Sequence, residues 1–376
     1  MIYFDNAAST RPCRAAVEAL NRALTDNYSN PSSLHKGGIE AEKIINAAKK
    51  TILSKLPAGG DLVFTSGGTE SNNLALFGLK APKNEKQRKI ITTAIEHPSV
   101  AEPIAEIERF GFTGSSSVSV LRLSPTKNQS LEDRIIEALD QDVHLISVMA
   151  VNNETGFIID TVKLYEAVKS RVPNCIVHID AAQGFMKVPV NGDLISISAH
   201  KIHGIKGIGG LFVRDGIQKR LNPRIRGGGQ QGGLRSGTEP TALIASFGAA
   251  VENFTYNHPH FTELSEHLAK LLENFDGVNY RLNSRAGSES LPHIVNFSVN
   301  GVKSEILLHY FAENDILISS GSACARNKKS RTLLDFGVTE KDADSALRLS
   351  FSAENTIDEI EIFAEILKAG INRFKR

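Results

Sequence analysis

Four short stretches of this sequence place residues with binding or catalytic chemistry directly after a run of apolar residues. In the first, FTSGGTESNN (64–73), a strand-like run leads into two glycines, and a helical pattern begins near Thr69. Backbone N–H groups and the positive end of a helix dipole at such a turn bind anions, and the Thr69 hydroxyl is an additional donor. The stretch therefore predicts a phosphate-binding turn, with an ordinary glycine turn capped by threonine as the structural alternative.

The second stretch, VHIDAAQ (177–183), ends a strand-like run with a carboxylate. Because strand side chains alternate, His178 and Asp180 face one side of the strand, and Val177 and Ile179 face the other. A buried carboxylate requires a cationic partner or a metal. No third ligand lies at a useful spacing, so we assign no metal site, and a satisfied structural aspartate is the alternative to a functional one.

The third stretch, DLISISAHKIHGIKGIGG (193–210), places Ser198, His200 and Lys201 after a strand-like run in a glycine-rich context. Desolvation at the end of a buried strand disfavours the charged form of a lysine. A neutral amine is a nucleophile that suits Schiff-base chemistry. The alternative is a lysine whose amine reaches solvent and has no chemical role.

The fourth stretch is the His-Pro pair in TTAIEHPSV (92–100). A proline disfavours helical geometry in the residue before it, so the imidazole of His97 is expected to project from a loop just after a strand. A histidine with a purely structural role is the alternative.

Taken together, the four stretches supply the parts that hold pyridoxal phosphate. These are a phosphate-binding turn, a carboxylate able to pair with the ring nitrogen, an aromatic histidine and a Schiff-base lysine. In open parallel sheets, ligands bind at the carboxyl ends of the strands. We therefore expect the four stretches to meet at one edge of one sheet.

The elements that must position these residues follow an alternating pattern. Apolar runs of strand length alternate with longer amphipathic stretches, which favours an α/β fold with a mostly parallel, doubly wound sheet covered on both faces. The predicted strands are 61–64, 89–93, 143–149, 175–179, 193–198 and 210–213, and the clearest helices between them are 71–79, 130–139 and 161–169.

The pattern changes near residue 255, where a long helical stretch is followed by strand-like HIVNFSV and by further helical patterns. We expect a large cofactor-binding domain over residues 15–255. A smaller α+β domain would comprise residues 256–376 together with the N-terminal segment 1–14.

Composition limits the classes of function. The chain has 376 residues and a formal net charge of +1, which indicates neither nucleic-acid nor membrane-surface binding. The N-terminus lacks the features of a secretory signal, and the longest apolar run, 242–251, is too short to span a bilayer. The cysteines Cys13, Cys175 and Cys324 lie far apart with no CxxC pair, so we expect no disulfide framework and a reducing, cytoplasmic location. Cys175 is predicted to be a small core residue.

The sequence also resembles a known family along nearly its whole length. It is similar to the cysteine desulfurases of the class V, fold-type I pyridoxal-phosphate enzymes. The matching stretches, in order, are YFDNAAST, SNPSSLH, FTSGGTESNNLAL, EHPSV, VNNETG, HIDAAQ, SAHKIHGIKGIGG, GGGQQGGLRSGTEP, SSGSAC and RLSFSAENTIDEI.

The resemblance implies a role for each residue of the cofactor site. Lys201 would carry the cofactor, and Asp180 would pair with the pyridinium nitrogen and strengthen the electron sink. Gln183 would bond the ring hydroxyl, while His97 would stack on the ring and serve as an acid or base. The residues implied to hold the phosphate are Gly68, Thr69, Ser198 and His200.

The resemblance also implies an assembly and a substrate grip. Thr238 would reach the phosphate of a neighbouring subunit, so a homodimer is expected. Asn152 and Arg348 would hold the substrate carboxylate, with Arg348 offering a bidentate fork.

Cys324, in SSGSACARNKKSR (319–331), would be the sulfur acceptor. L-cysteine would be converted to L-alanine while Cys324 takes its sulfur as a persulfide and passes it to an acceptor or scaffold protein, for iron–sulfur clusters, tRNA thiolation or cofactor synthesis. The bases after Cys324 could lower the pKa of its thiol or attract an acidic partner, and a solvated loop face is the alternative. Other reactions of the same fold stay open, namely a selenocysteine lyase, an aminotransferase or a β-lyase, and so does a sulfur-assembly platform without catalysis.

Besides the basic run after Cys324, which is unusual for the family, the chain departs from the family pattern in three further places. Ile205 stands where a proline is frequent and Gln231 where a glutamate is frequent, and the segment after Arg348 differs from the usual wording.

Overall fold

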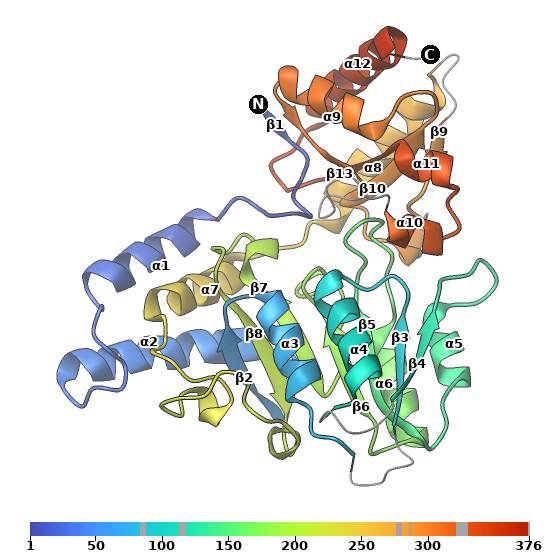
Figure 1. The fold of residues 1–376 in the computed structure, drawn as a ribbon. Coiled ribbons are helices and arrows are strands. Elements are labelled where there is room, and N and C mark those ends of the chain that lie inside the picture. The colour runs from blue at the N-terminus through green and yellow to red at the C-terminus, as the bar shows by residue number, and fades with distance from the viewer. Residues whose placement is uncertain (83–87, 113–117, 276–279, 286, 321–329, 375–376) are drawn as a thin grey trace. The chain divides into compact units, whose positions relative to one another are not determined.

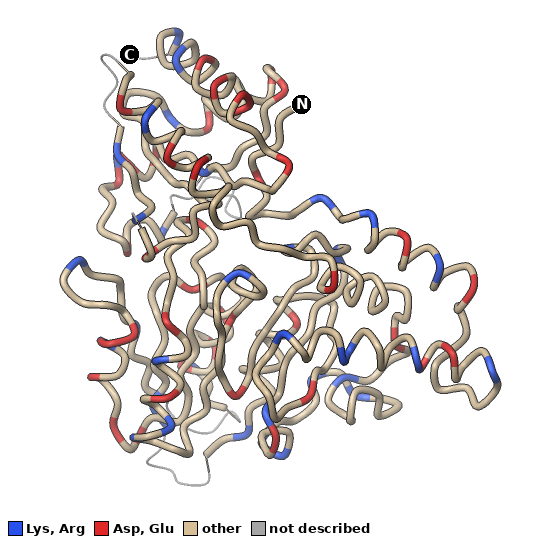
Figure 2. The backbone as a smooth tube through the Cα atoms, turned by 180° about the vertical axis from the view of Figure 1, so that it is seen from behind, with Lys and Arg blue, Asp and Glu red and all other residues tan. Residues whose placement is uncertain are grey.

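The computed structural model describes residues 1–82, 88–112, 118–275, 280–285, 287–320 and 330–374. The chain divides into two compact units (Figure 1). The large unit comprises Arg11–Ala150 and Ile159–Thr255, and the small unit comprises Met1–Thr10, Val151–Ile158 and Tyr256–Arg376. Basic and acidic residues are interspersed along the backbone of both units (Figure 2), and their numbers nearly balance, with a formal net charge of +1.

A seven-stranded sheet forms the centre of the large unit, with the order β2-β8-β7-β6-β5-β3-β4 among the described residues. Every neighbouring pair is parallel except the two pairs that β8 makes with β2 and β7. The prediction of an α/β fold with a mostly parallel sheet is confirmed. The strands are β2 (Gly60–Thr65), β3 (Lys89–Thr93), β4 (Ser119–Leu123), β5 (Val143–Met149), β6 (Ile176–Asp180), β7 (Leu194–Ser198) and β8 (Gly209–Arg214).

Two features of this sheet differ from the sequence prediction. β8 runs antiparallel to its neighbours, because the short connection from β7 to β8 contains no helix long enough for a parallel crossover. β4 was not predicted at all. It is an edge strand whose residues are half-buried or exposed, so it lacks the continuous apolar run of a central strand.

Helices cover the sheet of the large unit. Apolar residues of α3 and α4 join those of the strands in one buried cluster, and Figure 1 shows both helices on the same side of the sheet. The helices are α1 (Arg14–Thr25), α2 (Lys36–Leu53), α3 (Gly68–Gly78), α4 (Pro98–Phe110), α5 (Leu131–Glu137), α6 (Thr161–Arg171) and α7 (Thr241–Asn253), with short 3-10 turns η1 (Ala199–Lys201), η2 (Gln218–Arg220) and η3 (Gln231–Gly233).

Strand register brings the carboxyl ends of β2, β5, β6 and β7 to one edge of the sheet. Gly209, at the start of β8, lies opposite both Thr65 and Ser198. Asp180 lies opposite both Met149 and Ser196. The predicted site stretches of β2, β6 and β7 therefore follow strands that end side by side, at the edge where open parallel sheets bind ligands.

The small unit is built on an antiparallel four-stranded sheet, β12-β13-β10-β9, and on a short parallel pair, β1-β11. Its core is rich in phenylalanine, and the buried rings of Phe311 and Phe363 stack with centroids 4.7 Å apart. Its elements are β1 (Ile2–Tyr3), α8 (His258–Glu273), β9 (Tyr280–Leu282), η4 (Gly287–Glu289), β10 (Ile294–Val299), α9 (Ser304–Glu313), β11 (Ile316–Leu317), β12 (Ser319–Ser320), α10 (Arg331–Asp335), α11 (Glu340–Asp344), β13 (Ala346–Ser350) and α12 (Ile357–Phe374).

None of the helices in the described residues is long and apolar enough to cross a membrane.

Gly209 provides a test of how closely the strand ends pack. A Cβ added at this position would lie 2.6 Å from the carbonyl oxygen of Ile197 and 2.7 Å from Cα of Gly67. Both neighbours are backbone atoms that cannot turn away, so Gly209→Ala is expected to lower the free energy of unfolding by about 1–3 kcal/mol. Urea denaturation measures the change. Gly228→Ala is the matched control, because its added Cβ would meet only the flexible side chain of Gln230. Equal unfolding midpoints for the two variants would contradict the packing described here.

Candidate active site

The turn between β2 and α3 has the structure of an anion-binding site. α3 begins at Gly68, and the N–H groups of a first helical turn have no partner within the helix. A Cβ added at Gly68 would lie 3.6 Å from Cβ of Ala182 and 3.8 Å from Cβ of Ser198, so this turn faces the ends of β6 and β7. Ser198 Oγ is buried and has no hydrogen-bond partner among the described residues. An unsatisfied buried hydroxyl costs about 1–3 kcal/mol, and a phosphate oxygen in this place would satisfy it. The residues present therefore fit a bound phosphate group.

Asp180 ends β6 at the same edge and is 6% exposed. Its Oδ2 accepts a hydrogen bond from Asn72 Nδ2 at 2.8 Å, and its Oδ1 accepts one from the backbone N–H of Ala182 at 2.9 Å. Gln183, three residues further on, is also buried. A carboxylate held in this way is suited to pair with a protonated ring nitrogen.

Lys201 lies on η1, directly after β7. Burial, with the nearby charges of Lys201, Lys206 and Lys187, lowers the pKa of His200 to about 4. Burial and the charge of Lys201 also lower the pKa of Lys187 to about 7. A bound anion would favour the protonated forms of these groups, because it would offset the burial and the neighbouring positive charge that disfavour them. Lys187 was missed in the sequence, where GFMKVP carries no strand or helix signal that would single it out.

His97 is the N-cap of α4, with Pro98 at the first helical position. Its backbone is extended (φ −61°, ψ 147°), which confirms that the proline keeps it out of helical geometry. Its Nδ1 accepts a hydrogen bond from the backbone N–H of Ser99 at 3.1 Å and lies 2.7 Å from Ser99 Oγ. Burial, with the charge of Lys201, lowers the pKa of His97, and the charge of Asp180 acts in the opposite direction.

Glu96 is a buried acid beside His97 that sequence reasoning missed. Its Oε1 accepts hydrogen bonds from Thr93 Oγ1 at 2.5 Å and from the backbone N–H of Met149 at 3.0 Å, which ties the ends of β3 and β5 together. Burial raises the pKa of Glu96 to about 8, and the charge of Asp180 adds to this effect. The carboxyl is therefore protonated at neutral pH.

His178 has a structural role. Its Nδ1 lies 2.8 Å from Ser147 Oγ on β5, and its Nε2 lies 3.1 Å from Ser196 Oγ on β7. Burial lowers its pKa to about 4, so the ring is neutral. Within the described residues, no group of three or more His, Cys, Asp or Glu side chains could hold a metal ion.

Arg348 and Asn152 belong to the small unit. Arg348, on β13, is 3% exposed; its Nη1 donates to the carbonyl of Asn153 at 2.8 Å, and its Nη2 pairs with Asp5 Oδ1 at 2.7 Å. Its Nε is buried and has no hydrogen-bond partner in the described part of the chain. Asn152 Oδ1 accepts hydrogen bonds from the backbone N–H groups of Glu154 and Thr155 at 3.0 and 2.9 Å.

Cys324 and the basic residues up to Lys329 lie outside the described residues. The chain is described again from Ser330, which caps α10 by accepting a hydrogen bond from the N–H of Leu333 at 3.1 Å. Ser330 also donates to the buried carboxyl of Glu154 at 2.5 Å. Burial raises the pKa of Glu154, while its hydrogen bonds and Arg348 act in the opposite direction.

The segment around Thr238 explains one of the departures from the family pattern. Thr238 itself is exposed. Gln231 Oε1 accepts a hydrogen bond from the backbone N–H of Phe64 at 2.8 Å, and Gln231 Nε2 donates to the carboxylate of Glu239. An amide can accept from one group and donate to the other, whereas an ionised glutamate at position 231 would repel Glu239.

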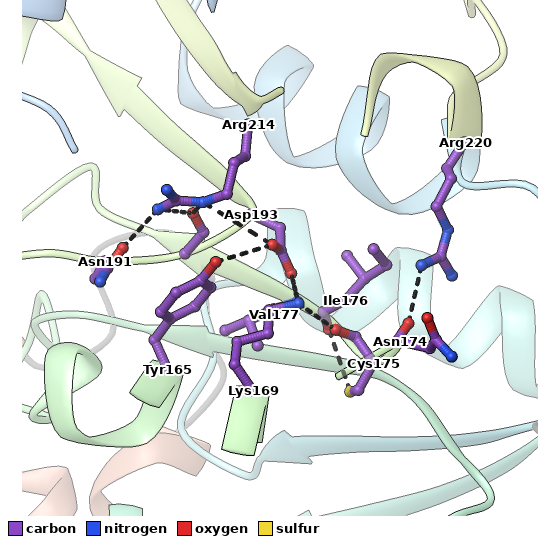
Figure 3. A network of polar contacts seen from close by, with 11 residues as sticks. Tyr165, Lys169, Asn174, Cys175, Ile176, Val177, Asn191, Asp193, Arg214 and Arg220 are labelled. Atoms are coloured by element: carbon purple, nitrogen blue, oxygen red, sulfur yellow. Dashed lines mark hydrogen bonds and ion pairs between the residues drawn. The ribbon is translucent and has the colours of Figure 1, made fainter. Parts of the chain in front are cut away.

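Cys175 is a core residue, as predicted. The thiol is 1% exposed, and burial raises its pKa to about 12, so it is inert at neutral pH. It lies beside the polar network of Figure 3, where Asp193 binds Lys169 Nζ at 2.5 Å and the backbone N–H of Val177 at 2.9 Å. Lys169 Nζ also donates to the carbonyl oxygen of Cys175, which fixes the start of β6.

A turn that fits a phosphate, the buried carboxylate of Asp180 and Lys201 follow strands that end at one edge of a mostly parallel sheet, as expected of a fold-type I pyridoxal-phosphate enzyme. The chain belongs to the aminotransferase class-V family, whose sequence model matches residues 2–363. Members of this family depend on pyridoxal phosphate.

Several curated relatives match the chain over nearly its full length. A "NifS/IcsS protein homolog" from Lactobacillus delbrueckii subsp. bulgaricus is 37% identical over 96% of this chain and 95% of its own. A "Cysteine desulfurase IscS" from Neisseria meningitidis serogroup C is 36% identical over 100% of this chain and 93% of its own.

Solved structures agree with these relatives. A "NIFS-LIKE PROTEIN" superposes with a TM-score of 0.86 at 30% identity, covering 99% of both chains. The structure "SspA in complex with cysteine" superposes with a TM-score of 0.78 at 31% identity, covering 93% of this chain and 99% of the other.

Glu96 predicts a pH dependence of stability. The folded protein holds the Glu96 proton up to about pH 8, whereas the pKa of a free glutamate side chain is 4.5. Between these pH values the folded state binds a proton that the unfolded chain releases, so stability falls as the pH rises, on the order of 1.4 kcal/mol per pH unit. In Glu96→Gln the side chain does not titrate, so this loss is removed. We expect the variant to match wild type near pH 4 and to be more stable by roughly a few kcal/mol at pH 8.

Urea midpoints measured across this pH range test the expectation. Glu102→Gln on the exposed face of α4 is the control, and its profile is expected to follow wild type. A Glu96→Gln profile as steep as that of wild type would show that Glu96 is not the group that titrates.

Proposed function

We propose that this protein is a cysteine desulfurase, which converts L-cysteine to L-alanine and transfers the sulfur to Cys324 as a persulfide. The observation that carries the proposal is the meeting of an open anion turn, Asp180 and the Lys201 segment at one sheet edge, in a chain similar over its full length to a protein named cysteine desulfurase. A protein that only bound phosphate would need the anion turn but neither the buried carboxylate of Asp180 nor Lys201.

The cofactor of the proposed reaction is pyridoxal phosphate, which Lys201 would hold. When bound, it would supply an electron sink that stabilises negative charge at the substrate carbon. Asp180 would pair with its ring nitrogen, Gln183 would bond its ring hydroxyl and His97 would stack on its ring. Its phosphate would be held by Gly68, Thr69, Ser198 and His200. The open turn at Gly68 and the unpaired hydroxyl of Ser198 support this assignment.

Arg348 and Asn152 are proposed to hold the substrate carboxylate. The guanidinium, which is planar by its own bonding, is held in place by Asn153 and Asp5, and its Nε has no hydrogen-bond partner among the described residues. A fixed planar fork is the arrangement that recognises a carboxylate most selectively.

The sulfur step balances without an external oxidant. The Cys324 thiolate attacks the substrate sulfur; an S–S bond forms, the Cβ–S bond breaks, and the carbon takes up a proton to become alanine. The persulfide sulfur then passes to a thiol of an acceptor or scaffold protein. Of the other two cysteines, Cys175 is buried and inert, and Cys13 caps a helix distant in sequence from every site stretch.

A homodimer is proposed as the working assembly. The segment that joins α1 to α2 exposes large apolar side chains that a second copy could cover, with Tyr28 81% exposed and Leu34 95% exposed. Leu24 and Ile39 on the flanking helices are 58% and 44% exposed. The exposed Thr238 is available to reach the phosphate site of the second copy.

Cys324→Ala tests the reaction. Wild type incubated with L-cysteine and a thiol reductant is expected to release alanine and sulfide in equal amounts. The variant is expected to lose at least about a hundredfold in both products, because the nucleophile is gone, while its cofactor absorbance stays intact. Cys13→Ala, which removes a partly exposed thiol, is the matched control. An equally active Cys324→Ala would rule out persulfide transfer through this residue.

Two further outcomes separate the alternatives. Turnover of selenocysteine but not of cysteine would assign a selenocysteine lyase. Cofactor binding without turnover of either would leave the fold class intact and reject the substrate, whereas absence of any cofactor band, in wild type as in Lys201→Ala, would favour a platform without catalysis.

The dimer is tested by light scattering after size exclusion. Wild type is expected at twice the chain mass of 40.8 kDa. Leu34→Glu is expected to shift the mass toward the monomer, because burying an unpaired charge in an apolar contact is costly. Ile362→Glu, at a position 47% exposed on α12, is the control. A dimer that withstands Leu34→Glu would place the interface elsewhere.

A further inference from the structure

A chain of hydrogen bonds joins Asp180 to His97 through two residues that have no role in the cofactor site described above. Asn72 Nδ2, on α3, donates to Asp180 Oδ2 at 2.8 Å and to Ser99 Oγ at 2.9 Å. Ser99 Oγ lies 2.7 Å from His97 Nδ1. Asn72 and Ser99 are 1% and 8% exposed, so no solvent competes for these bonds.

The Asp180 carboxylate can only accept hydrogen bonds, and this sets which group donates in each of the other bonds of the series. Both oxygens of Asp180 receive N–H groups, so the Asn72 amide must point its NH2 toward the carboxylate. Turning the amide over would place Oδ1 against the Asp180 carboxylate, so that two acceptors would face each other and Asp180 Oδ2 would lose its donor from Asn72. Asn72 keeps this orientation although its Oδ1 is buried with no hydrogen-bond partner in the described residues, at a cost of about 1–3 kcal/mol.

The bond from Asn72 to Ser99 also determines which group donates in the bond between Ser99 and His97. Its oxygen accepts from Asn72, so its single proton is left to donate to His97 Nδ1. The backbone N–H of Ser99, which can only donate, points at the same nitrogen at 3.1 Å. With two donors directed at it, Nδ1 must be unprotonated. A neutral imidazole carries one proton, which is therefore on Nε2.

Resting on the proposed function, we propose that Asn72 and Ser99 are positioning residues that hold His97 in the Nε2–H tautomer, so that His97 donates a hydrogen bond to the bound substrate or cofactor and does not act as a general base. Accepting a proton requires a free ring nitrogen. Nε2 already carries a proton, and a proton on Nδ1 would face the backbone N–H of Ser99, which cannot turn away. Proton removal from the substrate is thereby left to the amine of Lys201. This narrows the acid or base role that the family resemblance implies for His97.

The surroundings of His97 act in the same direction. Burial and the charge of Lys201 disfavour the imidazolium, and burial also keeps the neighbouring Glu96 protonated. The opposing charge is that of Asp180, which is already bound by Asn72 and Ala182.

Nitrogen-15 NMR of the His97 ring tests the tautomer directly, in the cofactor-free protein as well as with cofactor. At neutral pH we expect a protonated, pyrrole-type Nε2 and an unprotonated, pyridine-type Nδ1. The ring is expected to stay neutral when the pH is lowered to the ordinary pKa of histidine and somewhat below it. In Ser99→Ala and Asn72→Leu the preference is expected to weaken by roughly three- to tenfold, the contribution of one ordinary hydrogen bond. The pKa of His97 is expected to rise, because the neutral ring is less well stabilised. Ser99→Thr keeps the hydroxyl and is expected to restore the wild-type spectrum, and Asn253→Ala on the exposed end of α7 is the control.

A pyridine-type Nε2 or an imidazolium in wild type at pH 7 would overturn the proposal. So would spectra of Ser99→Ala and Asn72→Leu that match wild type. These readings do not depend on turnover, so a failure of the proposed desulfurase reaction would be seen separately.

Kinetics give a second, independent test. Glutamine can donate a hydrogen bond but cannot act as a base, so His97→Gln is expected to retain at least about tenfold more kcat than His97→Phe. A general base would instead make both variants equally slow, by roughly 10²–10⁴-fold. The acid limb of the pH profile of kcat/KM is expected to be the same in His97→Gln and wild type.

Discussion

The buried carboxylate of Asp180 is the constraint around which the large unit is arranged. A carboxylate 6% exposed must find donors inside the protein, and it finds them on α3 and on its own turn. The bond from Asn72 fixes α3 against the sheet edge. The same helix begins one turn earlier with Gly68, so the position of the anion turn and that of the carboxylate are set together. A ligand that has a phosphate at one end and a basic ring nitrogen at the other could contact the anion turn and the carboxylate at the same time.

Around Asp180, burial keeps most other titratable groups neutral. The pKa of Glu96 is raised to about 8 and those of His178 and His200 are lowered to about 4, and burial is the first cause in each case. Few charges therefore compete at this edge, and those that stay are held by hydrogen bonds. In a buried site the direction of each hydrogen bond is informative, because a polar group left without a partner there is costly. Asn72 and the backbone N–H of Ala182, both directed at the Asp180 carboxylate, illustrate this pre-organisation.

The contrast between the cysteines shows how environment decides reactivity. Cys175 lies at the start of a central strand, fixed by Lys169 and desolvated, and its thiol is unavailable. Cys324 stands in the sequence SSGSACARNKKSR, between small residues and a basic run. One residue type thus serves as packing in the first case and as the proposed sulfur acceptor in the second.

The sequence by itself determined the central strands and the class of fold, and it predicted the residues of a cofactor site. These are local properties of the sequence. Runs of apolar residues indicate β5 and β6, and glycine, proline and charged residues that follow the strands single out Gly68, His97, Asp180 and Lys201. Only the tertiary structure decided that β8 runs antiparallel, that β4 pairs at the edge, and that residues 151–158 belong with the C-terminal elements. It alone revealed Asn72 and Ser99, because the Asn72–Asp180 bond joins residues 108 positions apart and no periodicity encodes such a pair. The tautomer of His97 belongs to this second kind of information, since it depends on the direction of hydrogen bonds that exist only after three strand ends and two helices have come together.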